Sequence, residues 1–294
     1  MWKNQNIAKK ARSWAGKWTR PTEKMERKRG ASLIVQLCLG AFLFFSAAVP
    51  GNYPYAEHSG SQAGQPALES AATQPETDPL LLNSRAAVLL DGDTGRVLYG
   101  KNETEVLPMA STTKIMTCIL ALENAGPDTE VLISDRAASM PEVKLHAGKG
   151  EKYRLEDLLY SLMLESHNDS AVAVAEHIGG SVEEFAEKMN RKAWEIGCKN
   201  VCFVTPNGLD VADADGNEHS ASAADMARIM RYCAFQSPCR ETFLEITRTA
   251  SRTIQDESGN RSFYLANHNA LLSQCAEVLS GKTGFTGKAG YWRR

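Results

Sequence analysis

Serine and lysine three residues apart can carry out nucleophilic catalysis, and Ser111-Thr112-Thr113-Lys114 has this spacing. On a helix, residues three apart share one face, so the Ser111 hydroxyl and the Lys114 amine can meet. A serine hydroxyl is a weak nucleophile until a base takes its proton. A lysine can be that base only when burial or a neighbouring cation lowers its pKa. We therefore predict a helix starting at Ser111, with Ser111 as nucleophile and Lys114 as base.

A second element, Ser166-His167-Asn168, has the pattern S-x-N and is predicted in a loop between helices. The Ser166 hydroxyl can carry a proton to a leaving amine. The Asn168 amide can bind the backbone of a substrate. Alone, this short pattern is weak, because S-x-N occurs often by chance.

A third element, Lys282-Thr283-Gly284, is predicted on a strand over Val278 to Thr283. Lys282 and Thr283 offer a cation and a hydroxyl to a substrate carboxylate, and Lys282 is also the cation that would lower the pKa of Lys114. Gly284 has no side chain, so substrate can lie against the strand. The N–H groups of Ser111 and Phe285 would then face the reacting carbonyl as an oxyanion hole.

Periodic apolar residues predict the elements that position these motifs. Short apolar runs at 86–90 and 96–99, around Asp91 to Gly95, predict a β-hairpin. Helical spacing follows Ser111, recurs at 155–162, and resumes after the S-x-N loop at 171–178 and 185–196, where Gly197 ends it. Ser222 with Asp225 three residues on predicts a further helix start. Strands at both ends, with helices between them, predict a sheet built from both ends and covered by helices.

The charge distribution separates an N-terminal segment from the rest. Residues 1–30 hold ten Lys or Arg and two Glu, a net charge of +8, whereas the remaining residues carry −10. An acidic body argues against nucleic acid as a partner. Residues 31–49 contain no charge and would span roughly 28 Å as a helix, close to a bilayer core. Together these segments predict a cytoplasmic basic region and a secretory signal or membrane anchor, so the following residues lie outside the cytoplasmic membrane.

Residues 50–83 are predicted to be a disordered linker, because five of the eleven prolines fall at 50–79 among small and polar residues. The folded catalytic domain then covers residues 84–294. Six of the seven cysteines follow the apolar run, and export would permit disulfides such as Cys198–Cys202 or Cys233–Cys239. Most are interpreted as buried thiols instead. No cysteine pair has the spacing of a metal site, and His146, His177, His219 and His268 are interpreted as surface or satisfied core residues.

The trio S-x-x-K, S-x-N and K-T-G, in this order, is known from β-lactamases and penicillin-binding proteins. Over roughly residues 84–291 the chain resembles the low-molecular-mass D-alanyl-D-alanine carboxypeptidases. Four segments carry the resemblance: Pro108 to Thr117, Gly281 to Thr286, Asp157 to Tyr160 leading into Ser166 to Asp169, and the hairpin Asp93 to Tyr99.

The resemblance implies an α+β fold of the β-lactamase/DD-peptidase-like transpeptidase type, an antiparallel sheet flanked by helices with an all-helical subregion. It implies removal of the terminal D-alanine from peptidoglycan stem peptides ending in D-Ala-D-Ala, through an acyl-enzyme on Ser111, which β-lactam antibiotics would also acylate. Ser111, Lys114, Ser166 and Asn168 would be catalytic. Lys282, Thr283, Gly284 and Phe285 would bind substrate. No metal or organic cofactor is implied.

Two departures from the family pattern stand out. His167 occupies the middle of S-x-N, where these carboxypeptidases usually have glycine. It is expected to point to solvent; the alternatives are that it narrows the site or tunes a neighbouring pKa. Only ten residues follow Gly284, so the family's C-terminal strands and helix are expected to be missing.

Three alternatives to a carboxypeptidase remain. The first is an inactive truncated remnant or a non-catalytic wall-binding protein, which the short C-terminus favours. The second is a DD-endopeptidase, which uses the same trio. The third is a β-lactamase, which needs a glutamate to activate the deacylating water; Glu183, Glu184 and Glu187 lie on a predicted helix without a loop signature.

Overall fold

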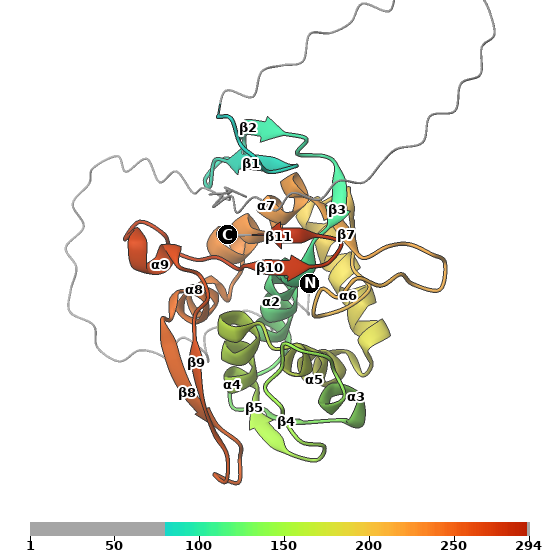
Figure 1. The fold of residues 1–294 in the computed structure, drawn as a ribbon, viewed down its shortest axis with the longest axis vertical. Coiled ribbons are helices and arrows are strands. Elements are labelled where there is room, and N and C mark those ends of the chain that lie inside the picture. The colour runs from blue at the N-terminus through green and yellow to red at the C-terminus, as the bar shows by residue number, and fades with distance from the viewer. Residues whose placement is uncertain (1–79, 293–294) are drawn as a thin grey trace, which may run out of the picture.

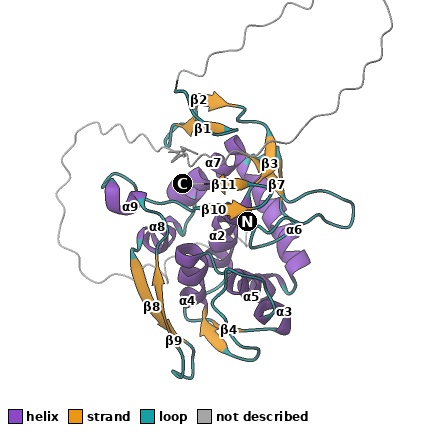
Figure 2. Ribbon diagram, in the orientation of Figure 1, coloured by secondary structure: helices purple, strands orange, loops and turns teal. Residues whose placement is uncertain are grey.

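The computed structural model of the protein describes residues 80–292. Helices fill the centre of this part, and small antiparallel sheets lie around them (Figures 1 and 2). The α-helices are α2 (Lys114–Asn124), α3 (Asp135–Ala138), α4 (Leu155–Tyr160), α5 (Asn168–Gly179), α6 (Val182–Ile196), α7 (Ala223–Arg231), α8 (Arg240–Arg248) and α9 (Leu271–Gln274). The 3-10 helix η1 (Ala110–Thr113) runs into α2, and the π-helical turns η2 (Ser161–Glu165) and η3 (Tyr232–Gln236) continue α4 and α7.

The strands form five small antiparallel sheets among the described residues. The two-stranded ones are β1 (Ala87–Leu90) with β2 (Val97–Lys101), β4 (Glu130–Leu132) with β5 (Lys152–Arg154), β8 (Ser251–Gln255) with β9 (Ser262–Ala266), and β10 (Gly284–Thr286) with β11 (Gly290–Trp292). In the fifth, β7 (Ser220–Ser222) lies between β3 (Val106–Pro108) and β6 (Val201–Cys202). This mixture of helices and antiparallel strands confirms the α+β class.

Helix α2 is the centre of the hydrophobic core. Its residues from Lys114 to Leu122 are all buried, and it packs against α5, α8 and η2. A helix that is apolar on every side is stable only when surrounded, and each buried large side chain contributes about 1.5–3 kcal/mol. The S-x-x-K residues therefore stand at the start of a helix that is buried over most of its length.

The predicted local signals are confirmed at the helix ends and in the first hairpin. The Asp91 carboxylate accepts from Thr94 N at 2.7 Å in the turn between β1 and β2. The Ser222 side chain caps α7 by accepting from Asp225 N at 3.1 Å. Gly197 ends α6 in the left-handed conformation, with φ of 92°, where a residue without a Cβ is favoured.

The strand predicted over Val278 to Thr283 is wrong. The strand starts at Gly284, and within the described residues its only ladder partner is β11. β-Branched and apolar residues at 278–283 imitate a strand, but a strand also needs a neighbour for its backbone groups. The segment is held by side chains instead: Ser280 Oγ donates to Thr247 Oγ1 at 2.7 Å, and Gly281 packs on Asn269.

The single sheet predicted from both chain ends is also not present as one ladder. The hairpin β1–β2 packs on α7, whereas β10 packs on η1, so each pair forms its own two-stranded sheet in residues 80–292. Whether the two hairpins can join depends on how α7 and η1 are placed relative to each other. Tertiary packing decides that placement, and strand patterns in the sequence do not predict it.

The six described cysteines are free thiols, and four of them are buried, which confirms the interpretation of most cysteines as buried thiols. Burial raises the pKa of Cys239 and Cys198 to about 12. The predicted basic region, apolar segment and nearly all of the linker lie outside the described residues and stay predictions. Within residues 80–292, no helix has the length and apolar character needed to cross a bilayer.

Candidate active site

Ser111 and Lys114 lie on one face at the junction of η1 and α2, as their spacing predicts. Lys114 Nζ is 3.1 Å from Ser111 Oγ. Ala110 turns the chain from β3 into η1 with a positive φ of 48°, and Thr113 Oγ1 donates to Ala110 O at 2.8 Å. This tight first turn presents Ser111 at the start of a buried helix.

Lys114 is fully buried and has three partners. Besides Ser111, its Nζ lies 2.9 Å from Asn168 Oδ1 and 2.7 Å from Asn207 O. Burial lowers the pKa of Lys114 well below its usual value, and the nearby Lys282 lowers it further, against an opposing effect of Asp169. A neutral amine has two N–H donors and one lone pair. Because Asn168 Oδ1 and Asn207 O can only accept, the two N–H groups of the neutral amine would point to them and its lone pair to the Ser111 hydroxyl.

Asn207 is a site residue that the sequence analysis treated only as part of a turn. Its carbonyl reaches Lys114 because Gly208 brings the turn directly against η1. A Cβ on Gly208 would stand 1.9 Å from Ala110 O, and its φ is +89°. The Asn-Gly pair signalled the turn, but a backbone acceptor leaves no signature of its own in a sequence.

The S-x-N motif lies where it was predicted, in the junction between η2 and α5. Ser166 has a positive φ of 69°, and Asn168 is the first residue of α5. The Asn168 amide is oriented from its other side, because Asn168 Nδ2 donates to Pro141 O at 3.2 Å. This bond leaves Oδ1 as the atom that faces Lys114.

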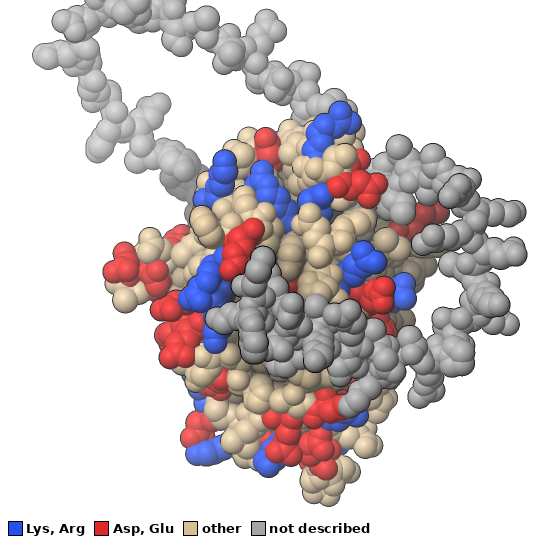
Figure 3. Space-filling view, turned by 180° about the vertical axis from the view of Figure 1, so that it is seen from behind, with Lys and Arg blue, Asp and Glu red and all other residues tan. Residues whose placement is uncertain are grey.

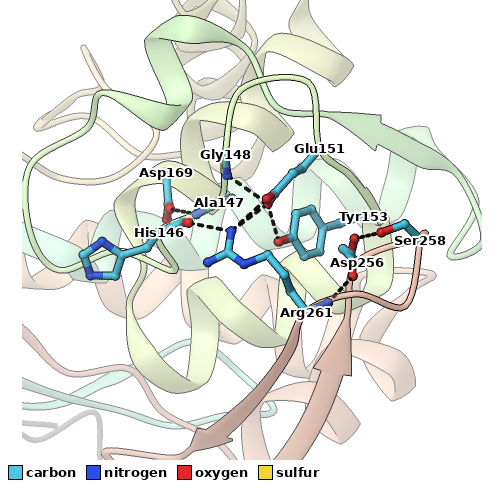
Figure 4. Close-up of polar contacts among 9 residues, drawn as sticks. All are labelled: His146, Ala147, Gly148, Glu151, Tyr153, Asp169, Asp256, Ser258 and Arg261. Atoms are coloured by element: carbon cyan, nitrogen blue, oxygen red, sulfur yellow. Dashed lines mark hydrogen bonds and ion pairs between the residues drawn. The ribbon is translucent and has the colours of Figure 1, made fainter.

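Asp169 anchors the same junction through backbone groups. Its buried carboxylate accepts from Leu145 N at 2.9 Å. It also accepts from Ala147 N at 3.2 Å (Figure 4). A carboxylate held by several N–H donors is strongly oriented. The loop before β5 therefore fixes the start of α5 and, with it, Asn168.

The expectation that His167 points to solvent is wrong. Its side chain is buried, and Nδ1 lies 2.8 Å from Ser161 Oγ, which in turn lies 2.7 Å from Ser170 Oγ. Burial lowers the pKa of His167 to about 4, against an opposing effect of Glu165. The start of α5 packs on η2, and this packing buries the side chain. His167 therefore ties the S-x-N junction to η2.

Lys282 joins the third motif to the second. Its Nζ lies 3.1 Å from Ser166 Oγ and donates to Thr283 O at 2.8 Å. Burial lowers the pKa of Lys282 to about 7. Of the other predicted residues, Thr283 is half-buried beside it, and the Phe285 side chain is 55% exposed while its backbone belongs to β10.

Gly284 brings β10 into direct contact with η1. A Cβ there would stand 3.0 Å from Ser111 N and 3.2 Å from Ala110 Cβ and Thr112 N. The absence of a side chain thus serves packing against the S-x-x-K turn, in addition to the room for substrate that the sequence predicts.

The hairpin β8–β9, which the sequence analysis did not predict, supports the site from outside. Arg261 Nη1 donates to Glu151 Oε1 at 2.8 Å and to His146 O at 2.9 Å (Figure 4). At its other end, Ala266 N donates to Glu165 Oε1 at 2.7 Å. The hairpin is therefore bound both to the loop that holds Asp169 and to the turn before Ser166. Such partners are distant in sequence, which is why pattern analysis missed them.

Two alternative kinds of site receive no support. In residues 80–292, no group of three His, Cys, Asp or Glu side chains is arranged to hold a metal ion. Glu183 and Glu184 lie in the first turn of α6, and Glu183 forms an ion pair of 2.9 Å with Arg136 of α3. The Glu183 carboxylate therefore lies at the surface in this pair.

Residues 70–292 match the family model described as D-alanyl-D-alanine carboxypeptidase. The chain belongs to this peptidase family. It is 38% identical over 224 residues to the D-alanyl-D-alanine carboxypeptidase DacF of Bacillus subtilis, which covers 73% of this chain and 54% of DacF. It is 31% identical over 215 residues to a D-alanyl-D-alanine endopeptidase of Pseudomonas aeruginosa, covering 71% of this chain and 66% of the relative. The chain thus spans about half the length of DacF.

Solved structures confirm the fold. A D-alanyl-D-alanine carboxypeptidase from Mycobacterium tuberculosis matches with a TM-score of 0.64 and 27% identity, covering 71% of this chain and 75% of that one. Penicillin-binding protein D2 from Listeria monocytogenes, in an ampicillin-bound form, matches with a TM-score of 0.62 and 28% identity, covering 72% and 83%. The expected DD-peptidase fold is therefore confirmed over the matched part.

Proposed function

We propose that the protein is a serine-type D-Ala-D-Ala carboxypeptidase that removes the terminal D-alanine of peptidoglycan stem peptides. One observation carries the proposal. Two hydrogen-bonded links join residues from three distant motifs: Ser111 with Lys114 and Asn168, and Ser166 with Lys282. Family membership and these links together favour acyl transfer on Ser111 over a non-catalytic role.

The acylation step follows from the state of Lys114. Its lone pair takes the proton of the Ser111 hydroxyl while Ser111 Oγ attacks the carbonyl carbon of the penultimate D-alanine. General base catalysis of this kind contributes about 10²–10⁴-fold. The carbonyl oxygen becomes an oxyanion, for which the N–H groups of Ser111 and Phe285 are the proposed donors.

Collapse of the tetrahedral intermediate breaks the C–N bond and expels the terminal D-alanine. Its amine takes the proton that Lys114 removed from Ser111, which we propose is relayed by the Ser166 hydroxyl, held 3.1 Å from Lys282 Nζ. Lys114 is then neutral again, and Lys282 keeps its own proton. Water hydrolyses the ester on Ser111 with Lys114 as base. A β-lactam would be attacked in the same way, but its leaving amine stays attached to the acyl group.

Substrate binding is assigned to the K-T-G segment. Lys282 is buried and, with a pKa of about 7, is readily protonated when an anion binds next to it. The terminal carboxylate of the stem peptide is such an anion, and the Thr283 hydroxyl adds a hydrogen bond. Asn168 would hold the peptide backbone on the opposite side of Ser111.

The location of the substrate agrees with the predicted N-terminal segments. Peptidoglycan lies outside the cytoplasmic membrane, so the signal or anchor at residues 31–49 would deliver the domain to the outer face of that membrane or to the wall. On the described part of the face in Figure 3, acidic and basic side chains are interspersed. This face does not offer the continuous basic surface that nucleic acid binds.

The proposal is tested by incubating the full chain with a pentapeptide that ends in D-Ala-D-Ala and measuring free D-alanine. Release by the wild type, and none by Ser111→Ala, is expected. A folded chain that releases no D-alanine would overturn the proposal in favour of a remnant or wall-binding protein. Cleavage of a cross-linked muropeptide dimer without D-alanine release would instead identify an endopeptidase.

A further inference from the structure

His219 has no place in the three motifs, yet it is buried next to them. The residue precedes β7, and only 2% of its surface is exposed. Phe203 packs on the ring edge-on, with ring centroids 6.0 Å apart. A buried imidazole with both nitrogens hydrogen-bonded is fixed in orientation.

The hydrogen bonds of His219 determine its tautomer. Nδ1 accepts from Val204 N at 2.9 Å and from Thr205 N at 3.3 Å. Because both partners are backbone donors, Nδ1 carries no proton, and the proton of a neutral ring lies on Nε2. Burial lowers the pKa of His219 to about 4, in agreement with a neutral ring.

The Nε2 proton starts a one-way series of hydrogen bonds that ends at the proposed oxyanion hole. Nε2 lies 2.7 Å from Thr113 Oγ1, which must accept this bond. Thr113 Oγ1 then donates its own proton to Ala110 O at 2.8 Å. The Ala110 carbonyl belongs to the same peptide group as Ser111 N, so the series holds and polarises the group whose N–H faces the reacting carbonyl.

The His219 ring also contacts the segment that orients Lys114. Val204 N and Thr205 N, which donate to its Nδ1, precede the turn whose Asn207 carbonyl binds Lys114. That turn packs on Ala110 O through Gly208. His219 therefore lies between the element that carries the oxyanion donor and the element that orients the base.

We propose that His219 is a positioning residue that acts through Thr113 to hold the Ala110–Ser111 peptide in the orientation required of an oxyanion donor. The inference rests on the proposed acylation of Ser111. Ordered hydrogen bonds in series strengthen one another, and donors placed in advance stabilise the transition state without reorganisation.

Two substitutions interrupt the series at different atoms. Thr113→Val removes the hydroxyl but keeps the branched shape, and His219→Asn keeps an acceptor for the backbone donors but loses the Nε2 proton. For each we expect the rate constant of Ser111 acylation by benzylpenicillin to fall about tenfold to a hundredfold, below the 10²–10³ that losing an oxyanion donor outright costs. The dissociation constant of the complex formed before acylation should change less than threefold. The exposed His177 of α5, changed to Asn, is the control.

The double variant separates a series from two independent effects. If His219 acts through Thr113, Thr113→Val with His219→Asn loses no more than the worse single variant. Thr113→Ser, which keeps the hydroxyl, should restore most of the rate. In the acyl-enzyme, the ester carbonyl stretch should shift to higher frequency in Thr113→Val, because a weaker oxyanion hole polarises that bond less.

The results also distinguish this inference from the proposed function. If the wild type forms no acyl-enzyme, the proposed function fails. If the wild type is acylated and folded Thr113→Val reacts equally fast, with an unshifted carbonyl stretch, the positioning role is overturned. It is likewise overturned if neither single variant folds, since His219 would then serve folding rather than the oxyanion hole.

Discussion

Gly284→Ala tests whether β10 packs directly on the turn that carries the nucleophile. The added Cβ would stand 3.0 Å from Ser111 N and 3.2 Å from Thr112 N. Both neighbours are backbone atoms of η1, which cannot rotate away as a side chain can. β10 and η1 must therefore separate by a few tenths of an ångström, and the Ser111 N–H moves relative to Phe285.

The expected magnitude differs between stability and activity. An added methyl in a packed site costs about 1–3 kcal/mol, while replacing glycine where the backbone permits it returns about 0.4–1 kcal/mol. The net loss is about 1 kcal/mol, or roughly 2–4 °C in the unfolding midpoint. Since a misplacement of 1 Å can cost about a hundredfold in rate, a shift of a few tenths should slow acylation about tenfold.

Stopped-flow measurement of Ser111 acylation, together with thermal unfolding, checks both numbers. Gly287→Ala is the matched control, because it lies in the same β10–β11 hairpin and a Cβ there meets nothing within 4 Å. We expect Gly287→Ala to be acylated at the wild-type rate. The packing argument would be refuted if Gly284→Ala were also acylated at the wild-type rate, or if Gly287→Ala lost as much of its acylation rate as Gly284→Ala.

Three further substitutions test other contacts of the structure. Lys282→Met removes a cation that lowers the pKa of Lys114, an effect second only to burial. Lys114 should then lose its proton only at higher pH, so the acidic limb of the pH profile of the acylation rate should move to higher pH. An unmoved limb would contradict this. Gly208→Ala places a methyl against Ala110 O in a backbone conformation with φ of +89°. It should abolish acylation and lower the free energy of unfolding, measured by denaturant titration, by over about 3 kcal/mol. Retention of activity would show that the turn can move away from Ala110. Asp225→Ala leaves Lys199 N and Asn200 N without their buried acceptor. It should lower the free energy of unfolding by about 3–5 kcal/mol, seen in calorimetry as an unfolding midpoint roughly 10 °C lower. A change below 1 °C would show that this acceptor does not stabilise the fold.

The chemistry-bearing residues could be predicted because their spacing is local. Ser111 and Lys114 share a helix face at any tertiary arrangement, and the helix ends at Ser222 and Gly197 depend on residues within one turn. The order of the three motifs then indicated which elements converge. These predictions rest on short-range geometry, and the structure places the residues accordingly.

The contacts that complete the site could not be predicted in this way. Asn207 contributes a backbone carbonyl, which every residue possesses. His219 reaches Thr113 across 106 positions, and the hairpin β8–β9 acts through Arg261, 110 positions from Glu151. His167 was expected to point to solvent, but its burial is decided by the packing of α5 on η2, which lies outside the motif.

The central claim is that Ser111, activated by Lys114, is an acylating nucleophile. Mass spectrometry of the full chain after incubation with benzylpenicillin tests it most directly, with Ser111→Ala and Lys114→Ala as comparison variants. We predict one covalent penicilloyl adduct that maps to Ser111, is absent in Ser111→Ala and forms much more slowly in Lys114→Ala. A folded wild-type chain without an adduct, or an adduct on another residue, would contradict the account.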